Sequence, residues 1–285
     1  MIIAGFSSID ELKYLLKRRV AGIFIPSWMA GEPEVYDLIR SSGYDGIVAT
    51  DNEGGYASWV VKGFPSPYSV GQSMERYGEI SGILNSYRRM ASLLRSRGIN
   101  MNFAPVVDLH SKNNDVIGGK GRSFSSDPFR VIAAAEIFWY AHSLEGVNVV
   151  FKHFVGQGRA VGDPHTGMSV YRLSEEDLND DLLPFAHFVS RGASYIMTAH
   201  VVIPFLDEEF PVTLSRKILH NLLREKLGFT GKIISDDMRM SAIEEHFGFD
   251  DAIKLALEAG VDYILISHGL DCVERAIEII RNTNL

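Results

Sequence analysis

Short apolar runs alternate with longer amphipathic segments along the whole chain. This alternation is typical of βα units, in which a buried strand is followed by a helix that covers a largely parallel sheet. We predict strands at Ile2–Ala4, Gly22–Ile25, Gly46–Ala49, Met101–Ala104, Val147–Phe151, Tyr195–Thr198, Lys232–Ile234 and Tyr263–Ile266. Eight such units predict a TIM (β/α)8-type barrel in a single domain over residues 1–285. A doubly wound sheet is the alternative, because periodicity does not show whether a sheet closes.

Capping residues and glycines bound the helices that we predict between these strands. One helix follows Ser7–Glu11 and runs to about Arg19, and the others cover Glu75–Arg97, Pro128–Glu145, Ser174 to before Gly192, Ser215–Leu227, and segments near Asp250–Ala259 and Cys272–Arg281. Each helix is amphipathic, so its apolar face is expected to pack on the sheet.

Polar residues follow most of the predicted strands directly. They are Asp51, Pro105 to Asp108, Lys152 and His153, His200, Asp236 and Asp237, and His268. In a closed barrel the carboxyl ends of the strands meet at one mouth, so these residues are expected to lie together there. The sequence therefore predicts an active site at this end.

The stretch from Phe151 to Val170 is the most informative of these strand ends, because it continues into a glycine-rich loop. Pro164 favours an extended backbone at Asp163, and residues two apart in an extended backbone project to the same side. Asp163 and His165 are therefore predicted to act as a pair. A carboxylate bonded to one imidazole nitrogen raises the basicity of the other, as proton transfer near neutral pH requires.

Composition limits the classes of partner. The chain has a net charge of −8 and no basic cluster, so we expect no nucleic-acid surface. The N-terminal MIIAGF is too short for a signal-peptide core, and no apolar run is long enough to span a bilayer, so we expect a cytoplasmic protein that does not bind membranes. Cys272 is the only cysteine, which rules out a disulfide within the chain. We expect neither a cofactor nor a metal.

Asp236 and Asp237 come directly after a predicted buried strand. A carboxylate in this place either caps the next segment or is held for chemistry, and spacing alone leaves both interpretations open for each residue. A carboxylate nucleophile and a separate acid/base group are the parts that a retaining glycosidase needs. Here the acid/base group would be a histidine backed by an aspartate, a variant that spacing alone does not predict.

Several segments resemble the β-N-acetylhexosaminidase branch of glycoside hydrolase family three. Residues 152–170, KHFVGQGRAVGDPHTGMSV, are similar to K-H-F-P-G-H-G-(x)4-D-S-H-x-G in that branch. Residues 51–55 (DNEGG), 99–108 (INMNFAPVVD) and 121–128 (GRSFSSDP) look like D-Q-E-G-G, G-I-N-x-x-F-A-P-V-x-D and G-x-R-S-F-x-x-D-P, and residues 198–201 and 234–238 match later motifs. The matches fall in family order over most of the chain.

The resemblance implies a single-domain barrel enzyme whose substrate is a small glycoside or glycoconjugate. It implies that Asp236 is the nucleophile, His165 the general acid/base and Asp163 its orienting partner. The positions that in the family hold the sugar hydroxyls and ring are matched by Asp51, Arg122, Lys152 and His153. The expected activity is that of an exo-acting retaining β-glycosidase that releases β-linked N-acetylglucosamine.

Four positions depart from the family pattern. Trp59 stands where the family has an arginine, so an aromatic platform would replace a charged sugar contact, and we include Trp59 among the substrate-binding residues. Gln157 and Arg159 fall within the family's G-H-G-D, where Arg159 reverses a charge beside the catalytic loop and is expected to alter the pocket. Lys232 occupies a strand position that is usually apolar.

Three other functions fit the same residues. A phosphorylase is possible because a histidine acid/base repels an incoming phosphate less than a carboxylate does. A metal-dependent hydrolase would use His153, His200, His268 and Asp236, although no H-x-H or H-E-x-x-H cluster is present. A glycan-binding homologue without turnover is the third.

Overall fold

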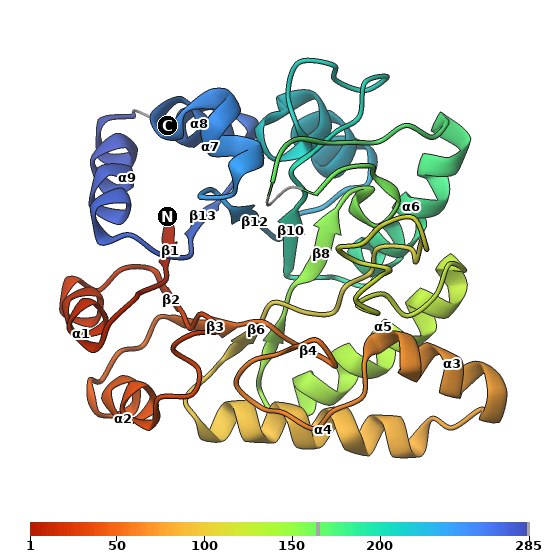
Figure 1. Ribbon diagram of the computed structural model, residues 1–285, viewed down its shortest axis with the longest axis horizontal. Helices are drawn as coiled ribbons and strands as arrows, with labels where there is room; N and C mark the ends of the chain where they lie inside the picture. Colours follow the sequence, from red (N-terminus) through yellow and green to blue (C-terminus); the bar gives the residue numbers. More distant parts are fainter. Residues whose placement is uncertain (164–165, 284–285) are drawn as a thin grey trace.

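The computed structural model describes residues 1–163 and 166–283. A sheet of nine parallel strands, in the order β7-β6-β3-β2-β1-β13-β12-β10-β8, forms a ring that helices surround (Figure 1). These strands are β1 (Ile2–Ala4), β2 (Gly22–Phe24), β3 (Ile47–Thr50), β6 (Met101–Asn102), β7 (Asn148–Val149), β8 (Phe151–Phe154), β10 (Tyr195–Thr198), β12 (Lys232–Asp237) and β13 (Tyr263–Ile266).

The two end strands of the sheet, β7 and β8, belong to one continuous segment in which only Val150 separates them. β7 pairs with β6, and β8 pairs with β10 on the other side. A backbone hydrogen bond of 2.7 Å from Val107 to Lys152 adds a further link at this seam. The sheet therefore closes into a barrel with eight strand positions, which confirms the predicted (β/α)8 class and excludes the doubly wound alternative.

Helices cover the outside of the barrel. They are α1 (Ile9–Arg18), α2 (Pro33–Ser41), α3 (Pro67–Tyr77), α4 (Ser81–Ser96), α5 (Pro128–Leu144), α6 (Glu175–Ser190), the π-type helix η3 (Lys217–Lys226), α7 (Ser241–Phe247), α8 (Phe249–Ala259) and α9 (Leu270–Asn282). Two short 3-10 segments, η1 (Gln157–Arg159) and η2 (Val212–Leu214), lie in loops.

The prediction of one helix over Glu75–Arg97 is wrong, because the chain forms α3 and α4 there. Gly78 ends α3 with φ 62°, and its N–H donates to the Met74 carbonyl at 3.0 Å. Glycine adopts this left-handed conformation without the steric cost that other residues meet. The strand predicted to end at Ile234 is also longer than expected, since β12 runs to Asp237.

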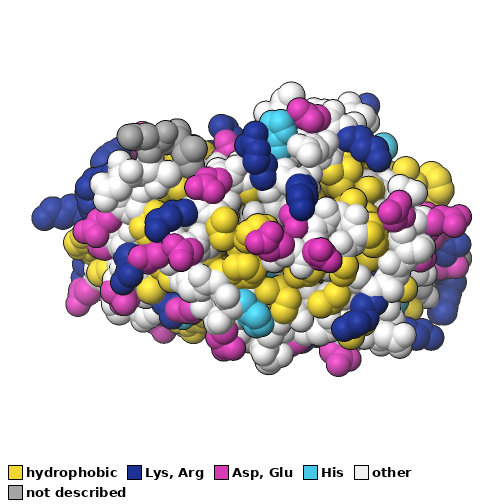
Figure 2. All heavy atoms as spheres, turned by 90° about the horizontal axis from the view of Figure 1, so that it is seen from above, with side chains coloured by type: hydrophobic (Ala, Val, Ile, Leu, Met, Phe, Trp, Pro, Cys, Tyr) yellow, Lys and Arg dark blue, Asp and Glu magenta, His cyan; other side chains and the backbone are white. Residues whose placement is uncertain are grey.

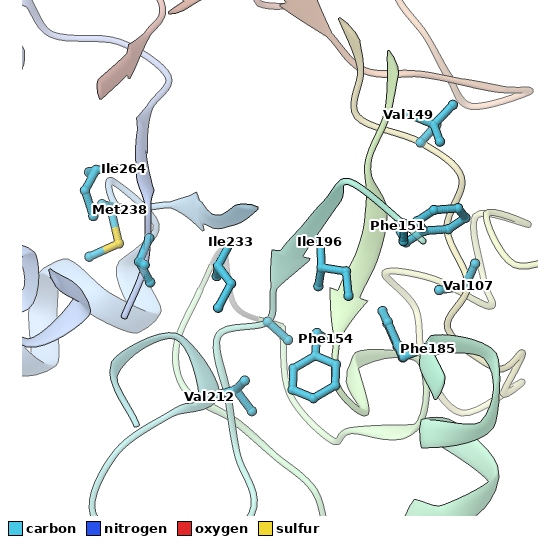
Figure 3. Close-up of a cluster of buried hydrophobic side chains, with 14 of the residues drawn as sticks. Val107, Val149, Phe151, Phe154, Phe185, Ile196, Val212, Ile233, Met238 and Ile264 are labelled. Atoms are coloured by element: carbon cyan, nitrogen blue, oxygen red, sulfur yellow. The ribbon is translucent and has the colours of Figure 1, made fainter. Parts of the chain in front are cut away.

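Two apolar layers form because successive strand side chains point to opposite faces. The inner layer takes a residue from each strand position and comprises Ile3, Phe24, Ala49, Met101, Phe103, Val150, Met197, Ile234 and Leu265. The outer layer, between the strands and the helices, includes Phe151, Phe154, Phe185, Ile196 and Ile233 (Figure 3). The barrel interior is thus a packed core.

Two small sheets lie at the carboxyl end of the barrel. β4 (Asn52–Gly54) and β5 (Ala57–Ser58) form an antiparallel hairpin directly after β3. β9 (Ser169–Val170) pairs in parallel with β11 (Val201–Val202), which follows β10. Both structures tie loops to the rim of the barrel.

The surface is mixed in charge. Figure 2 shows a face on which acidic and basic side chains are interspersed around apolar areas, without one continuous basic region. Within the described parts of the chain, no helix combines the length and the apolar character that crossing a membrane requires.

Candidate active site

A cavity of about 450 Å³ opens at the carboxyl ends of the strands. Four side chains of the inner apolar layer also line it: Phe24, Phe103, Met197 and Leu265. The polar lining includes Asp51, Glu53, Arg122, Lys152, His153 and Asp236. The structure therefore brings together six of the predicted site residues and adds Glu53; the six are Asp51, Trp59, Arg122, Lys152, His153 and Asp236.

One wall of the cavity is an ion-pair network. Lys152 Nζ lies 2.6 Å from Asp51 Oδ1 and 2.8 Å from Glu53 Oε1. Arg122 holds Glu53 with two hydrogen bonds, of 2.9 Å from Nε and 2.7 Å from Nη2. The fork of a guanidinium matches a carboxylate in this way and fixes its orientation.

The charges of the network stabilise one another in a buried position. Burial opposes the ionisation of Glu53, but Arg122 and Lys152 outweigh it and lower the pKa of this carboxyl to about 2. Burial likewise opposes the charge of Lys152, whose pKa is nevertheless raised by Asp51 and Glu53. Both side chains therefore stay charged, and Asp51 and Lys152 can accept from and donate to sugar hydroxyls.

A neutral histidine stands behind this wall. Asn102 on β6 binds the backbone of Asn52 on both sides, because Asn52 N–H donates to Asn102 Oδ1 at 2.9 Å and Asn102 Nδ2 donates to the Asn52 carbonyl at 2.9 Å. Asn102 Nδ2 also lies 3.1 Å from Nε2 of the buried His142, whose Nδ1 lies 2.9 Å from the Phe138 carbonyl. A carbonyl only accepts, so His142 carries its proton on Nδ1 and accepts on Nε2. Burial lowers the pKa of His142 to about 4 and keeps it neutral.

His153 is held by Asp108. Asp108 Oδ2 accepts from His153 Nδ1 at 2.7 Å and from the His153 N–H at 3.1 Å, which leaves Nε2 of the ring free of this contact. Gly158 N–H donates to the other oxygen, Asp108 Oδ1, at 3.3 Å. A Cβ on Gly158 would lie 2.2 Å from the Leu109 carbonyl oxygen, so only glycine allows the loop to approach this closely.

Asp236 lies on β12, on the wall opposite this network. In the ring of strands, β12 and β3 are separated by three strand positions in either direction. Asp236 Oδ1 accepts from the Asp237 N–H at 2.8 Å, and no Lys or Arg side chain among residues 1–163 and 166–283 forms an ion pair with it. Burial opposes its ionisation, but the pKa of Asp236 is lowered by His153, by His200 and by the hydrogen bond from the Asp237 N–H. Asp236 is therefore an anion without a cation bound to it.

A hydrogen-bond chain positions the backbone of Asp236. Its N–H donates to Thr198 Oγ1 at 3.4 Å, Thr198 Oγ1 lies 2.7 Å from Thr213 Oγ1, and Thr213 Oγ1 lies 2.8 Å from His200 Nδ1. His200 Nε2 lies 3.0 Å from the Asp237 carbonyl, so Nε2 carries the proton and Nδ1 accepts. Burial lowers the pKa of His200, which favours this neutral form.

Asp237 makes different contacts from Asp236 and has a different role. Its carboxylate accepts from the Ser267 N–H at 3.0 Å, from the Ser267 hydroxyl and from the Arg239 N–H at 3.2 Å. Burial raises the pKa of Asp237. These bonds join the end of β12 to the end of β13 and to the turn at Arg239. The N-cap of α7 is Met240, without a side-chain cap, so Asp237 holds the strand ends together and does not cap this helix.

The loop that carries Asp163 and His165 is fixed at both ends. η1 begins three residues after β8, and β9 joins the returning limb to β11. Val161 and Val170 form an antiparallel bridge across it. Asp163 is half-buried and is not among the residues that line the cavity, while His165 lies outside the described residues. The predicted pairing of these two residues stays a prediction.

Comparisons with known proteins identify the family. The model of the glycosyl hydrolase family 3 N-terminal domain matches residues 10–285. A β-hexosaminidase of Methylococcus capsulatus is 31% identical over 282 residues, which covers 96% of this chain and 84% of that protein. The chain belongs to glycosyl hydrolase family 3.

Further relatives and solved structures are consistent with this assignment. A β-hexosaminidase of Xylella fastidiosa is 35% identical over 228 residues, with 78% of this chain and 67% of that protein covered. A family 3 β-N-acetylglucosaminidase from Paenibacillus has a TM-score of 0.87 at 29% identity, and the match covers 98% of this chain but only 56% of that one. NagZ from Neisseria gonorrhoeae, in complex with N-trifluoroacetyl-D-glucosamine, has a TM-score of 0.82 at 27% identity, with 99% and 85% covered.

The mouth of this family 3 cavity is aromatic. Trp59, which replaces the expected arginine, lines it and packs edge-on against Tyr56, with ring centroids 5.7 Å apart. Lys120 Nζ lies over the Tyr56 ring, 4.7 Å from its centroid. Trp28 and His268 form a second edge-on pair, at 6.0 Å. Rings at the mouth offer apolar faces on which a sugar can stack.

Two of the other departures from the family pattern, Arg159 and Lys232, lie away from the cavity. Arg159 binds Asp181 of α6, with Nη2 2.9 Å from Oδ2, and does not line the cavity. The expectation that it changes the pocket directly is therefore wrong. Lys232 opens β12 at the far end of the barrel and pairs with Asp262 at 2.8 Å, which accounts for a charge at that strand position.

The donors proposed for a metal have other partners or do not converge. Among the described residues, no three His, Cys, Asp or Glu side chains form a group that could hold a metal ion. His153 Nδ1 binds Asp108, and both ring nitrogens of His200 have hydrogen-bond partners. Nothing in this donor set favours the metal-dependent hydrolase.

Reasoning from the sequence missed several polar residues of the cavity, among them Glu53, Gln157 and Lys120. Glu53 lay inside the DNEGG segment, and its partners, Arg122 and Lys152, are distant in sequence. Gln157 lines the cavity, is only 3% exposed, and has a buried Oε1 with no hydrogen-bond partner in the described structure. Lys120 lies two residues before Arg122, in a stretch to which no function was assigned.

Proposed function

We propose that this family 3 glycoside hydrolase is a retaining exo-β-glycosidase that releases β-linked N-acetylglucosamine. The observation that carries the proposal is the contrast between the walls of the cavity. Asp51 and Glu53 are neutralised by cations, whereas Asp236 faces the same space as an anion without one. A sugar held by the ion-paired wall would present its anomeric carbon to Asp236.

In the proposed first step, an oxygen of Asp236 forms a bond to the anomeric carbon while the bond from that carbon to the leaving oxygen breaks. The general acid gives its proton to the leaving oxygen. Water then attacks the same carbon, gives a proton back to the acid/base group and frees Asp236, so the sugar leaves with its β configuration. The resemblance assigns the proton transfers to His165, with Asp163 as its orienting partner.

The names of the relatives support the choice of sugar. Two curated relatives are β-hexosaminidases, and one solved neighbour is a β-N-acetylglucosaminidase. The neutral forms of His142 and His200 behind the two walls are compatible with work near neutral pH.

The test is a panel of aryl β-glycosides that differ at the 2-position, each assayed with and without phosphate. We expect fastest turnover of the N-acetylglucosaminide and free N-acetylglucosamine as the product under both conditions. A sugar 1-phosphate product would replace the hydrolase with the phosphorylase. Preference for a plain β-glucoside would refute the choice of sugar.

The mechanism has a separate test in His165→Ala. A general acid matters most for poor leaving groups, so this variant should lose far more activity on alkyl glycosides than on activated aryl ones. Equal losses on both would contradict the acid role. Mass spectrometry after reaction with a slowly hydrolysed substrate should find the sugar on the peptide that contains Asp236.

A further inference from the structure

Four cationic side chains line the cavity, and three of them have a carboxylate partner. Arg122 binds Glu53, Lys152 binds Asp51 and Glu53, and Arg239 Nε lies 3.1 Å from Glu244 Oε2. These three cations belong to the wall itself, because their charges are already compensated. The fourth is Lys120.

Lys120 differs in having no acid beside it. Within residues 1–163 and 166–283, no carboxylate forms an ion pair with its Nζ, and the contact that fixes the ammonium is the face of Tyr56, 4.7 Å away. An aromatic face attracts a cation but accepts none of its protons in a strong hydrogen bond, so the N–H groups of Lys120 stay available to a ligand.

Hydrogen bonds hold the backbone of the loop around Lys120 in place. Gly119 N–H donates to the Asn114 carbonyl at 2.8 Å, and Gly121 N–H donates to the Gly118 carbonyl at 2.9 Å. The side chain of Asn114 in turn binds the carbonyls of Gln157 and Ala160 at 2.8 and 3.0 Å. The backbone at Lys120 is therefore held in place, and the contact with the Tyr56 ring positions the ammonium at the cavity wall.

That place is on the side of the cavity away from Asp236. Tyr56 belongs to the turn of the β4–β5 hairpin that follows β3, and Arg122 joins the loop of Lys120 to this hairpin through Glu53. Asp236 is on β12, which lies opposite β3 in the ring. A pyranose whose anomeric carbon faces Asp236 points its carbon 4 and its exocyclic carbon 6 toward the opposite wall, where Lys120 lies.

We propose that Lys120 and Tyr56 form a subsite for an anionic group on the far edge of the terminal sugar, a phosphate ester or carboxylate at carbon 6. This inference rests on the proposed function, because it uses the orientation that attack by Asp236 imposes. Lys120 gives the anion a charge-assisted hydrogen bond, and Tyr56 fixes the ammonium. Lys120 is thus a residue that determines substrate specificity.

The experiment compares three substrates with the same aryl leaving group: the β-N-acetylglucosaminide, its 6-phosphate and its 6-carboxylate. Because the leaving group is constant, the ratio of kcat/KM for an anionic substrate to that for the plain one reports the subsite. We expect the wild-type ratio to exceed one for at least one anion, and Lys120→Gln to lower that ratio about tenfold through KM. The anion with the larger ratio identifies the group that is recognised.

Lys112→Gln is the matched control, because Lys112 is an exposed lysine of the same loop that does not line the cavity. It should leave every kcat/KM unchanged. The proposal is overturned if the wild type does not prefer either anion, or if the preference persists in Lys120→Gln. Melting temperatures of both variants should match the wild type.

Calorimetric binding of N-acetylglucosamine and its 6-phosphate separates this inference from the proposed function. Tighter binding of the phosphate that Lys120→Gln abolishes would support the subsite even if no glycoside in the panel were turned over. Turnover of the plain glycoside without any preference for an anion in binding or kinetics would leave the glycosidase in place and remove the subsite.

Discussion

The two walls of the cavity hold their carboxylates in different ways. On the β3 side, Asp51 and Glu53 are bound by Lys152, and Glu53 also by Arg122. On the β12 side, the Asp236 carboxylate accepts from the neutral N–H of Asp237, and the Asp236 N–H donates to Thr198 Oγ1. A cation bound to a carboxylate withdraws the electron density that a nucleophile needs, so the first wall is suited to binding and the second to reaction.

The walls share the support behind them. Each rests on a buried histidine that burial keeps neutral, His142 behind Asn102 on the β3 side and His200 behind Thr213 on the β12 side. A neutral imidazole accepts at one nitrogen and donates at the other, so it can order a hydrogen-bond chain without adding charge. The difference between the walls therefore comes from the cations alone.

Removing the reactive carboxylate should have the largest effect. Asp236→Asn keeps the size of the side chain and removes its charge, and we expect kcat/KM on an activated aryl glycoside to fall at least about 10⁴-fold. Asp51→Asn is the matched variant on the other wall, where the main effect should be a higher KM. Comparable losses of kcat in the two variants would break the proposed division between the walls.

Glu53→Gln tests how far the first wall depends on its ion pairs. It leaves Arg122 and Lys152 buried with one acid fewer, and breaking a buried pair in this way costs about 3–5 kcal/mol of unfolding free energy. Urea denaturation would measure this loss. Glu34→Gln, which removes an exposed ion pair with Lys13, is the control and should cost less than about 1 kcal/mol. A small effect at Glu53 would show that the network is not a structural unit.

The neutral histidine behind the first wall makes stability depend on pH. The pKa of His142 in the folded chain, about 4, lies below the ordinary value of 6.5 because burial disfavours the charged ring, so between these values the unfolded chain binds a proton that the folded chain does not. Stability is complete above about pH 6.5 and falls as the pH drops toward 4, by about 3 kcal/mol in total. His142→Gln should flatten this part of the curve, whereas the exposed His220→Gln should not. An unchanged slope in His142→Gln would refute the assignment.

Thr213→Val tests the support of the second wall and should have the smallest effect on stability. It removes the hydroxyl between Thr198 and His200, which costs about 1–3 kcal/mol, and it frees the backbone of Asp236. Well below the melting temperature, we expect lower kcat with an unchanged inhibition constant for N-acetylglucosamine. Thr213→Ser, which keeps the hydroxyl, should restore kcat. A loss of stability without a loss of kcat would leave this chain with a structural role only.

Much of this site followed from local sequence. Asp51, Lys152 and Asp236 each stand where an apolar run ends, and that position places them at the mouth once the barrel closes. The partners that these and neighbouring residues bind could not be predicted in this way. The contacts of Glu53 with Arg122 and of Asn52 with Asn102 join residues 69 and 50 positions apart, which no local pattern shows.

The helix boundaries were predicted less well than the strands. The split between α3 and α4 depends on the left-handed backbone at Gly78, and a run of helix-forming residues hides that break. The placement of Arg159 failed for a related reason, because its charge is matched by Asp181 on a helix elsewhere in the chain. His165 was proposed from local spacing and lies outside the described residues, so its role is still a prediction.

The closure of the barrel through β7 and β8 also has a consequence for engineering. Because the number of strands sets the width of the ring, the spacing between the β3 and β12 walls is independent of the loops above them. Exchanging residues in the turn at Tyr56 or the loop at Lys120 would then change which sugar is accepted while leaving the nucleophile in register. Substrate specificity could then be engineered without altering the reaction at Asp236.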